Sequence, residues 1–414
     1  MSNMATRYRA EKRFQFYGKC AIALALTVLL FLLVTIIGHG WQGFLSTQIQ
    51  LTVTIDADAV GHDTKAWRHA DVSPFIKQAL LIHFPDAGNS SRDLRELAGL
   101  VSSGAVQTVR DALIVDPSMV GKPLPLWLPA SDKVDRAVKS HITKQVPESD
   151  RRISNRQLDW LENLQKDNAV RTVWNPYFFT GGDSREPELA GFMGSMVGSL
   201  FTLLACMVVA FPIGVMAAIY LEEFARKTSI TAFIELTINN LAAVPSIVYG
   251  LLGLSIYLNL LGIPRSAPVA GGLTLALMIL PTIIIATRAS LRAIPDSIRD
   301  AARALGASPL QVVLHHTFPL AIPGIMTGTI LGIARAMGET APLLMIGMVA
   351  FIVDIPCNLL EPATSMPVQI YLWSTSPEES FVEKTDAGII VLLLVLAIMN
   401  SAAMLIRKRF EHRW

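Results

Sequence analysis

Residues 19–40 read KCAIALALTVLLFLLVTIIGHG, a long run without an acidic residue. A helix needs roughly 20 mostly apolar residues to cross about 30 Å of hydrocarbon, and this run is long enough. A secretory signal peptide is the alternative, but its apolar core is normally shorter and ends in a small-x-small cleavage site. This run leads instead into Gly38-His39-Gly40-Trp41. We therefore predict an uncleaved membrane anchor.

The composition of the whole chain supports a membrane protein. Of its 414 residues, 52% are hydrophobic and 16% are charged, whereas a soluble domain usually carries about a quarter charged residues. The formal net charge of +2 is too small to indicate a nucleic-acid partner. Its three cysteines, Cys20, Cys206 and Cys357, allow no disulfide framework and show no metal-ligand spacing. We expect neither a metal nor a cofactor.

Further apolar segments lie at about 192–221, 232–262, 268–288, 320–352 and 387–406. With the basic N-terminus, residues 1–18, in the cytoplasm, six spans place every basic cluster on the same side: residues 222–230, residues 288–316 and the C-terminal tail. This agreement predicts an all-α integral membrane protein with about six transmembrane helices and both termini in the cytoplasm.

The segment between the first two spans, residues 41–190, is long enough to form an extracytoplasmic domain. Residues 51–56 alternate apolar and polar side chains like a strand. The rest is predicted to be mainly helical, near residues 72–83, 91–114, 131–144 and 155–166. It shows no glycine-rich phosphate loop and no catalytic triad. The predicted divisions are residues 1–18, 19–40, 41–190 and 191–414, the last containing a cytoplasmic loop at 289–319.

That loop contains the sequence SIRDAARALGASPLQVVLHHTFP at residues 297–319. Ser297 is predicted to cap a first helix that stops at Gly306. Ser308, followed by Pro309 and by Gln311 at the third helical position, forms a capping-box pattern for a second helix. In the first helix an apolar face is expected to contain Ile298, Ala301, Ala302 and Leu305, with Arg299, Asp300 and Arg303 off that face.

Two short helices at an angle have other interpretations. A DNA-binding pair uses similar geometry, but attachment to two spans holds this one against the bilayer. An inert interfacial helix is the stronger alternative. However, membrane-surface helices usually present large apolar groups, whereas Ala301, Ala302, Ala304 and Gly306 are small. Small side chains favour insertion into a groove on a protein.

The run Asp300-Ala301-Ala302, Gly306 and Pro319 resembles the EAA loop of ABC importer permeases, the family whose pattern is Glu-Ala-Ala-x3-Gly-x9-Ile-x-Leu-Pro. The departures are Asp for Glu at 300, His for Ile at 316 and Phe for Leu at 318. The resemblance implies a coupling helix that sits in a cleft of an ABC ATPase. We assign this coupling role to Asp300, Ala301, Ala302, Gly306, Ser308 and Pro319.

A second motif, ARAMGETAPLL at residues 334–344, places charges inside the fifth span. A charge at the centre of a spanning helix costs about 2.5–3.5 kcal/mol on insertion scales and usually faces an interior path. Arg335 and Glu339 are four residues apart and can pair on one helix face. They either neutralise each other structurally, or Arg335 offers its planar donor fork to an oxyanion while Glu339 holds it. Arg288 is a further candidate for an anion pathway, although a positive-inside anchor is its simpler role.

This motif, with FPIGVMAAIYLEE at 211–223 and NLAAVPSIVYG at 240–250, resembles the second permease subunit of phosphate importers. The resemblance runs from about residue 174 to the C-terminus and leaves the insert at 41–171 unexplained. It implies phosphate as cargo, and as partners a second permease subunit, an ABC ATPase dimer, a periplasmic phosphate-binding protein and the lipid of a bacterial inner membrane. Another oxyanion, such as phosphonate or sulfate, and a membrane-anchored sensor are the alternatives.

The sequence contains no Walker A pattern, G-x-x-x-x-G-K-[ST]. We therefore expect ATP to be hydrolysed by another chain, and this subunit to be a transporter component without catalytic residues.

Overall fold

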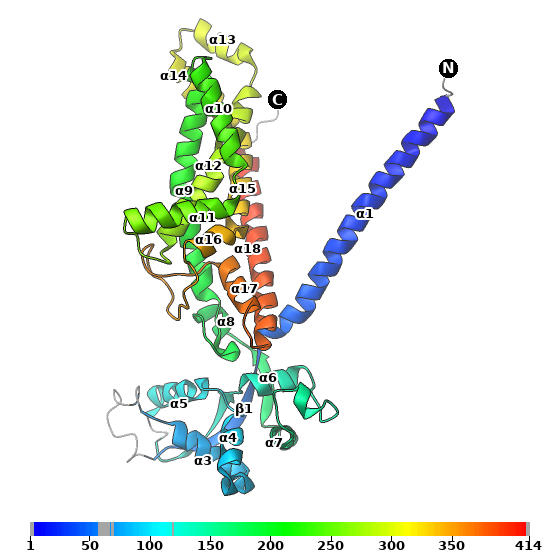
Figure 1. Cartoon of the computed structure of the whole chain (residues 1–414), viewed down its shortest axis with the longest axis vertical. Helices are drawn as coiled ribbons and strands as arrows, with labels where there is room; N and C mark the ends of the chain where they lie inside the picture. Colours follow the sequence, from blue (N-terminus) through cyan, green and yellow to red (C-terminus); the bar gives the residue numbers. More distant parts are fainter. Residues whose placement is uncertain (1–3, 57–66, 68–69, 118–119, 411–414) are drawn as a thin grey trace.

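The computed structural model describes residues 4–56, 67, 70–117 and 120–410. It has a tall helical bundle with a smaller domain at one end, called here the outer domain, residues 45–174 (Figure 1). Helix α1 (Met4–Gly43) leaves the junction between them and diverges from the bundle. Both chain ends and the α13–α14 segment lie at the opposite end of the bundle from the outer domain (Figure 1).

A three-stranded antiparallel sheet lies at the centre of the outer domain, in the order β2-β1-β3. The strands are β1 (Leu45–Thr54), β2 (Pro123–Pro129) and β3 (Val170–Trp174). The alternation predicted for β1 is confirmed, because Ile49, Leu51 and Val53 are fully buried on one face. The β2 sequence, PLPLWLP, was not expected to be a strand; its prolines are tolerated because β2 is an edge strand.

The outer-domain helices are α3 (Ser73–His83), η2 (Pro85–Asn89), α4 (Ser91–Ala98), α5 (Gly104–Val115), α6 (Asp132–Lys139), η4 (Glu148–Asp150) and α7 (Asn155–Lys166). Helices α3 and α7 match the predicted segments. The prediction of one helix over 91–114 is wrong: α4 ends before Gly99, and Val101 then pairs with Ala130 in an isolated bridge. The helix predicted over 131–144 ends at Lys139.

The remaining elements are α8 (Tyr177–Thr180), η5 (Pro187–Leu189), α9 (Met193–Ile219), η6 (Tyr220–Phe224), α10 (Ser229–Ala242), α11 (Ser246–Gly253), η7 (Leu254–Leu260), α12 (Pro268–Arg292), α13 (Asp296–Ala304), α14 (Pro309–Val312), η8 (Val313–Thr317), α15 (Phe318–Gly338), α16 (Ala341–Met345), α17 (Met366–Ser374) and α18 (Ser380–Phe410). In the part of the chain that the structure describes, five helices are long and apolar enough to cross a membrane, and a bent pair makes six if it is one span. The all-helical membrane fold with about six spans is therefore as predicted.

Two predicted spans are not continuous helices. The segment 232–262 bends by 99° between α10 and α11–η7, because Pro245 lacks an N–H and disfavours helix in the residue before it. In the segment 320–352, α15 ends at Gly338 and is followed by the short α16 and an irregular loop. Irregular backbone at membrane depth is tolerated only where protein or a water-filled cavity covers it.

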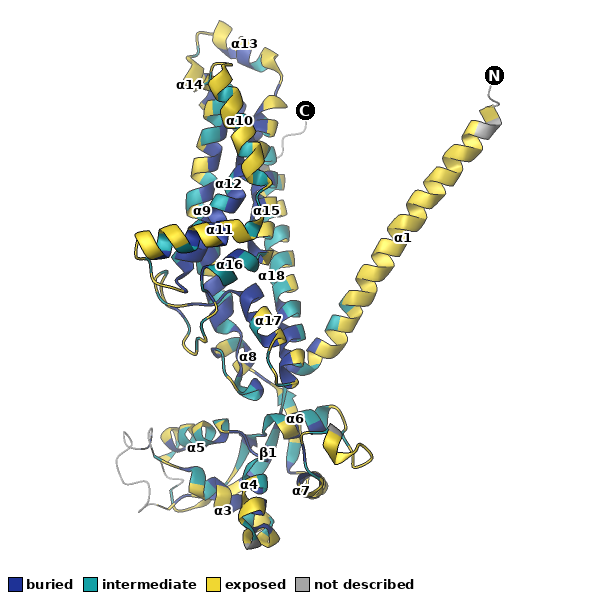
Figure 2. Cartoon of the chain, viewed as in Figure 1, coloured by how far each residue is buried: buried dark blue, intermediate teal, exposed yellow. Residues whose placement is uncertain are grey.

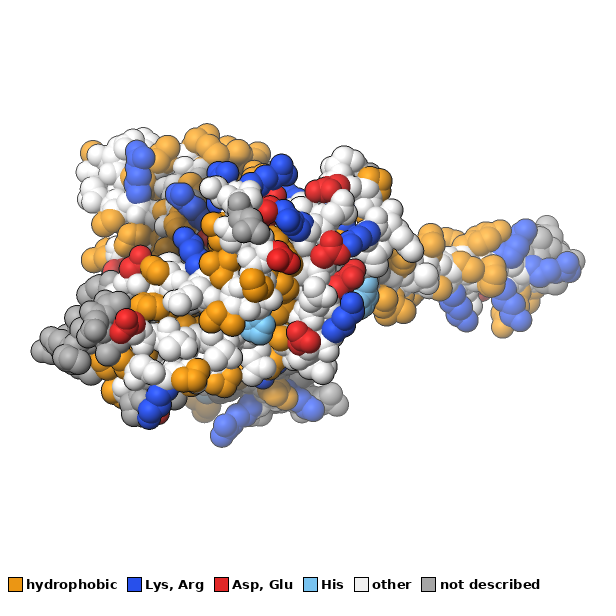
Figure 3. Space-filling view, turned by 90° about the horizontal axis from the view of Figure 1, so that it is seen from below, with side chains coloured by type: hydrophobic (Ala, Val, Ile, Leu, Met, Phe, Trp, Pro, Cys, Tyr) orange, Lys and Arg blue, Asp and Glu red, His pale blue; other side chains and the backbone are white. Residues whose placement is uncertain are grey.

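Helix α12 is the central element of the bundle, as its dark blue colouring shows (Figure 2). It packs closely on α9: a Cβ placed on Gly272 would lie 2.7 Å from the carbonyl oxygen of Thr202. Small residues at such contacts permit close helix approach. By contrast, the apolar window of α1 has no buried residue. Seen from below, α1 projects sideways with apolar side chains along it and basic ones toward its far end (Figure 3).

The junction between the outer domain and the bundle contains a buried acid, Glu188 of η5. Its pKa is raised to about 7, mainly by burial and to a smaller extent by the carboxylates of Glu186 and Asp132. Its Oε2 atom is buried without a hydrogen-bond partner among the described residues. The folded protein therefore holds a proton on Glu188 more tightly than the unfolded chain does.

We predict that Glu188→Gln changes the pH dependence of stability. Because the folded pKa is raised, the free energy of unfolding of the wild type falls as pH rises from the ordinary value of 4.5 towards 7, by up to about 3 kcal/mol. The glutamine variant lacks this contribution. Thermal unfolding of the detergent-purified protein at about pH 5 and about pH 8 measures it, with exposed Glu162→Gln as control. Equal pH dependence in wild type and Glu188→Gln would contradict the assignment.

Candidate functional site

The predicted cytoplasmic loop is a helical hairpin formed by α13 and α14. Gly306 lies between the two helices with φ of +85°, a left-handed conformation that favours glycine. The capping box at Ser308 is confirmed: its Oγ accepts from the backbone N–H of Gln311 at 3.4 Å, and the Gln311 Oε1 accepts from the Ser308 N–H at 2.8 Å. Pro319 is the second residue of α15.

Two details of the hairpin prediction are wrong. The first helix begins at Asp296 after Pro295, so Ser297 is not its cap. The buried face of α13 contains Arg299 and Ala302, whereas Leu305 is 91% exposed. Ala302 was expected among the small residues of the outer face, but it is buried, because the ion pair of Arg299 determines which side of this helix faces the bundle.

The exposed side of the hairpin is mainly apolar and combines alanines with leucines. Ala301, Ala304 and Leu305 are exposed on α13, as are Leu310 and Leu314 beyond the turn. Asp300 adds an exposed carboxylate whose only described partner is Arg303, at 3.5 Å. Exposed apolar patches rimmed by polar residues mark contacts with other proteins or with membranes.

Arg299 fixes this hairpin to the bundle. Its guanidinium donates to Glu223 at 2.8 Å and to the backbone carbonyls of Leu291 and Ile294, both also at 2.8 Å. The side chain of Glu223 is only 5% exposed, and its hydrogen bond raises the pKa of Arg299. One side chain therefore joins α13 to the ends of α12 and α9.

A second ion-pair group lies beside this one. Arg288, which is 9% exposed, donates to Glu222 at 3.3 Å and to Glu235 at 2.5 Å. Arg292 donates to the other oxygen of Glu222 at 2.8 Å. Arg288 is thus paired with carboxylates of η6 and α10, which favours the anchoring role over direct contact with an anion.

Arg335 and Glu339 lie where α15 ends. The Arg335 Nε is 3.5 Å from the Glu339 Oε1, so the expected pair forms. However, Glu339 has an extended backbone just beyond the helix, so the two residues do not share a helix face. The Arg335 side chain is 44% exposed, and Glu339 is its only partner among the described residues. Most of its donor fork is therefore available.

The two interrupted helices meet beside this pair. A Cβ on Gly250 of α11 would lie 2.7 Å from the Cα of Pro342 in α16, so these segments touch through their backbones. Tyr249, buried in α11, donates its hydroxyl to the carbonyl of Leu241 at 2.7 Å, which stabilises the bend after α10. Paired helix breaks at membrane depth are the arrangement in which transporters place ligand-binding backbone groups.

Comparisons with known proteins identify this architecture. Residues 210–414 match the family "Binding-protein-dependent transport system inner membrane component". "Phosphate transport system permease protein PstA 1" of Mycobacterium tuberculosis is 36% identical over 225 residues, covering 54% of this chain and 72% of that protein. The chain belongs to the ABC importer permease family.

Other relatives of this permease agree. "Phosphate transport system permease protein PstA" of Haemophilus influenzae is 32% identical, over 57% of this chain and 81% of that protein. "Probable ABC transporter permease protein YqgI" of Bacillus subtilis is 30% identical, over 55% of this chain and 81% of that protein. A solved structure of the MetNI methionine ABC transporter is similar only at a TM-score of 0.42 and 19% identity, over 52% of this chain and 95% of that one. Residues 1–148 match a domain of unknown function, DUF3333.

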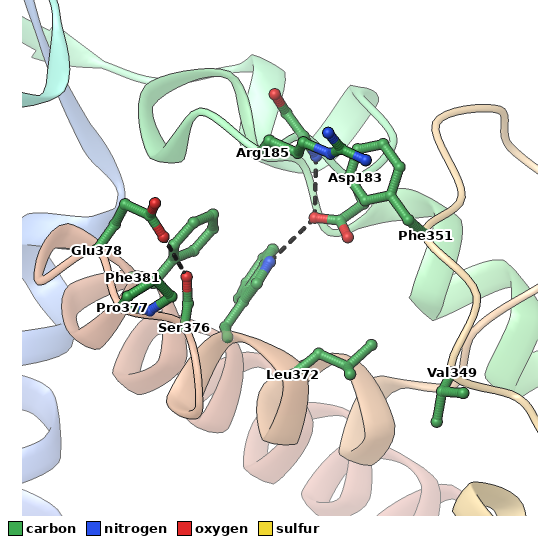
Figure 4. Close-up of a pocket in the computed structure, with 11 residues that line it drawn as sticks. Asp183, Arg185, Val349, Phe351, Leu372, Ser376, Pro377, Glu378 and Phe381 are labelled. Atoms are coloured by element: carbon green, nitrogen blue, oxygen red, sulfur yellow. Dashed lines mark hydrogen bonds between the residues drawn. The ribbon is translucent and has the colours of Figure 1, made fainter.

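A separate pocket of about 310 Å³ lies at the outer end of the permease (Figure 4). Its Asp183 Oδ1 accepts from the Trp373 indole at 3.0 Å and from the Ser184 N–H at 2.9 Å. Burial raises the pKa of Asp183. Neither Arg335 nor Glu339, called here the central pair, lines this pocket. The Asp183 carboxylate therefore holds its own loop against α17 and is separate from the central pair.

Glu222 and Glu223 were not predicted to position the hairpin. The available signal was two adjacent acids at the end of an apolar segment, facing a loop rich in arginine. Sequence alone assigned those arginines to the positive-inside rule, which requires no specific partner. Their pairing depends on α9 and α12 ending side by side.

We predict that Glu223→Gln loosens the hairpin, because it leaves the buried Arg299 with the 90% exposed Asp296, at 3.2 Å, as its remaining carboxylate partner among the described residues. Breaking a buried pair by removing one partner costs about 3–5 kcal/mol. Amide hydrogen exchange of residues 296–317 in the purified protein should become much faster. Arg303→Gln is the matched control, since its exposed pair with Asp300 contributes about 1 kcal/mol or less. Unchanged exchange in Glu223→Gln would contradict the anchoring role.

Proposed function

We propose that this chain is the permease subunit of an ABC importer for inorganic phosphate. It forms the translocation pathway with a second permease subunit, and a separate ATPase dimer drives it. The observation that carries this proposal is the anchored hairpin: its outer side is exposed while a buried arginine fixes its inner side to the ends of two spanning helices. Such an element transmits force from a docked motor to the spans.

The hairpin surface fits a groove on the ATPase. Asp300, Ala301, Gly306 and Ser308 are exposed there, whereas Ala302 is buried and supports the helix from behind. Small side chains permit close backbone approach, and Asp300 supplies a charge for an electrostatic partner. Because Arg299 ties the hairpin to α9 and α12, displacement of the hairpin moves both spans.

Phosphate is the proposed cargo because Arg335 presents a free guanidinium beside two helix breaks. A planar fork with several donors suits a tetrahedral oxyanion. Glu339 at 3.5 Å holds the arginine while the site is empty. The names of the Mycobacterium and Haemophilus relatives, both phosphate transport permeases, support the same cargo.

The arrangement also supports an orientation. The hairpin and both chain ends lie at one end of the bundle (Figure 1). The basic clusters of the sequence belong to these segments and to the connection between α9 and α10, so this end is the cytoplasmic side by the positive-inside rule. The outer domain then faces the periplasm from a bacterial inner membrane. A periplasmic phosphate-binding protein would deliver cargo at that side. ATP hydrolysis resides on the partner chain, and Arg288 serves as an anchor near the cytoplasmic exit.

We predict that Gly306→Trp prevents ATPase binding without preventing membrane insertion. A side chain at φ of +85° strains the turn, and the indole projects from the docking surface. Co-purification of the ATPase with tagged permease measures the effect. Gly262→Trp is the matched control, because Gly262 has a φ of +66° and equally open surroundings but lies outside the hairpin. Normal ATPase recovery with Gly306→Trp would refute docking at this hairpin.

We predict that Arg335→Gln abolishes phosphate uptake by the reconstituted importer, while exposed Arg265→Gln leaves it unchanged. Losing a charge-assisted bidentate contact costs about 1.5–3 kcal/mol or more per bond. Uptake of labelled phosphate into proteoliposomes measures this loss, and excess sulfate or phosphonate tests the cargo by competition. Full uptake by Arg335→Gln would mean that the arginine only neutralises Glu339. Competition by sulfate alone would exclude phosphate as cargo.

A further inference from the structure

Two buried lysines hold the corner where α1 becomes β1. Lys139 of the outer domain donates to the carbonyl of Leu45 at 2.8 Å, and Lys384 of α18 donates to the carbonyl of Gly43 at 2.9 Å. The Lys139 side chain is 4% exposed and also pairs with Asp135 at 2.6 Å. Each part of the protein thus contributes one ammonium group to the same turn of the chain.

The lysines also link the two parts directly. Lys139 lies 3.7 Å from Glu383 in the first turns of α18. Arg136 pairs with Glu379, and Arg152 donates to the carbonyl of Pro377 at 2.8 Å. These contacts place α6 and the loop before α7 on the start of α18.

A second set of contacts lies around η5. The hydroxyls of Ser103 and Ser102 donate to Glu186 at 2.6 and 3.2 Å. Gly104 approaches Leu189 so closely that an added Cβ would lie 2.5 Å from that side chain. The outer domain is therefore held to the bundle on two sides.

The chain has no spare length at this junction. Only Phe44 separates α1 from β1, and only Asn175 and Pro176 separate β3 from α8. The N–H of Asn175 donates to the carbonyl of Phe44 at 2.8 Å, so the entering and leaving strands are bonded together. Domains joined within one chain usually move relative to each other unless their interface is large and well packed. Here two of the three linking residues, Phe44 and Asn175, are buried and hydrogen-bonded to each other.

A single apolar cluster runs from this corner into the bundle. Phe44 contacts Phe178 edge-to-face at 5.3 Å, and Phe178 stacks on Phe192 at 5.7 Å. The same buried cluster includes Met337 of α15, which lies two residues from Arg335, and Val391 of α18. Close-packed interiors transmit displacement because they have little free volume.

We propose that the outer domain is a rigid extension of α18, through which a load applied outside the membrane reaches the Arg335 end of α15. The expected effect on uptake rests on the proposed transport function, whereas the expected rigidity of the outer domain does not. The proposal gives a mechanical role to the outer domain, most of which lies in the match to a domain of unknown function. A soluble partner that contacts the outer domain would act on the central pair without an intervening hinge.

The test measures one distance in the complete importer. Spin labels on Lys166→Cys in α7 and Val382→Cys in α18, both exposed, are placed in a background with the three native cysteines replaced. The distance between the two labels is measured by pulsed electron–electron double resonance in the resting complex and in the ATP–vanadate-trapped complex. We expect the same narrow distance distribution in both. A shift between the two states, in a complex that takes up phosphate, would overturn the proposal.

Substitutions at the corner test transmission. Lys139→Met should broaden the distribution and cause loss of most uptake, whereas Lys133→Met, on the exposed side of the same helix, should change neither. If Lys139→Met broadens the distance distribution but uptake persists, the mechanical role is overturned. If Lys139→Met leaves the distribution unchanged, Lys139 does not hold the outer domain against α18, and the proposed rigid attachment is overturned.

If Lys139→Met fails to insert into the membrane, substitutions at two glycines of α1 test the same rigid attachment. A Cβ on Gly43 would lie 2.4 Å from the carbonyl oxygen of Glu383, whereas Gly38 has open surroundings. Gly43→Ala should therefore broaden the distribution and reduce uptake, and Gly38→Ala should do neither. Equal behaviour of the two alanine variants would overturn the proposal. Failure of the unsubstituted complex to take up phosphate would refute the proposed function, and the distance measurement would still decide rigidity.

Discussion

In hydrocarbon, every backbone N–H and C=O group must find a partner within the protein, because no water is available. The architecture of this permease follows from that constraint. Its long helices satisfy their own backbone groups, and the two interrupted segments after α10 and α15 lie against one another. The hydroxyl of Tyr249 satisfies the carbonyl of Leu241 at the first break. The site with the most functional interest is thus located where irregular backbone is protected.

Charged groups follow the same rule with a higher energetic cost. Arg288 and Arg299 are both nearly buried, and each is paired with carboxylates at the end of α9 or in α10. Arg335 has a single, longer contact and a half-exposed side chain. The contrast separates arginines that hold the fold from an arginine with donors to offer a ligand. It also explains why the hairpin is positioned by polar contacts and still exposes apolar residues outward.

The hairpin and the outer domain lie at opposite ends of the bundle, and each is attached by buried ionic contacts. Arg299 attaches the hairpin to the ends of the α9 span and of α12. Lys139 pairs with Glu383 and so attaches the outer domain to α18, while Lys384 of α18 binds the carbonyl of Gly43 at the end of α1. Helix α15 begins just after the hairpin and ends at Gly338, and its last turn contains Arg335 close to the apolar cluster that extends from the outer domain. The central pair therefore lies between two fixed attachments, one on each side of the membrane.

The sequence by itself determined the membrane class, the number of spans, the capping box at Ser308 and the turn at Gly306. These depend on local composition, spacing and backbone conformation. Only the tertiary structure decided where two of the spans break, that the proline-rich β2 is an edge strand, and which side of α13 is buried. Each of these depends on a partner distant in the chain: Pro342 beside Gly250, β1 beside β2, and Glu223 beside Arg299. Periodicity describes one helix at a time, and it contains no information about which distant group will satisfy a buried charge.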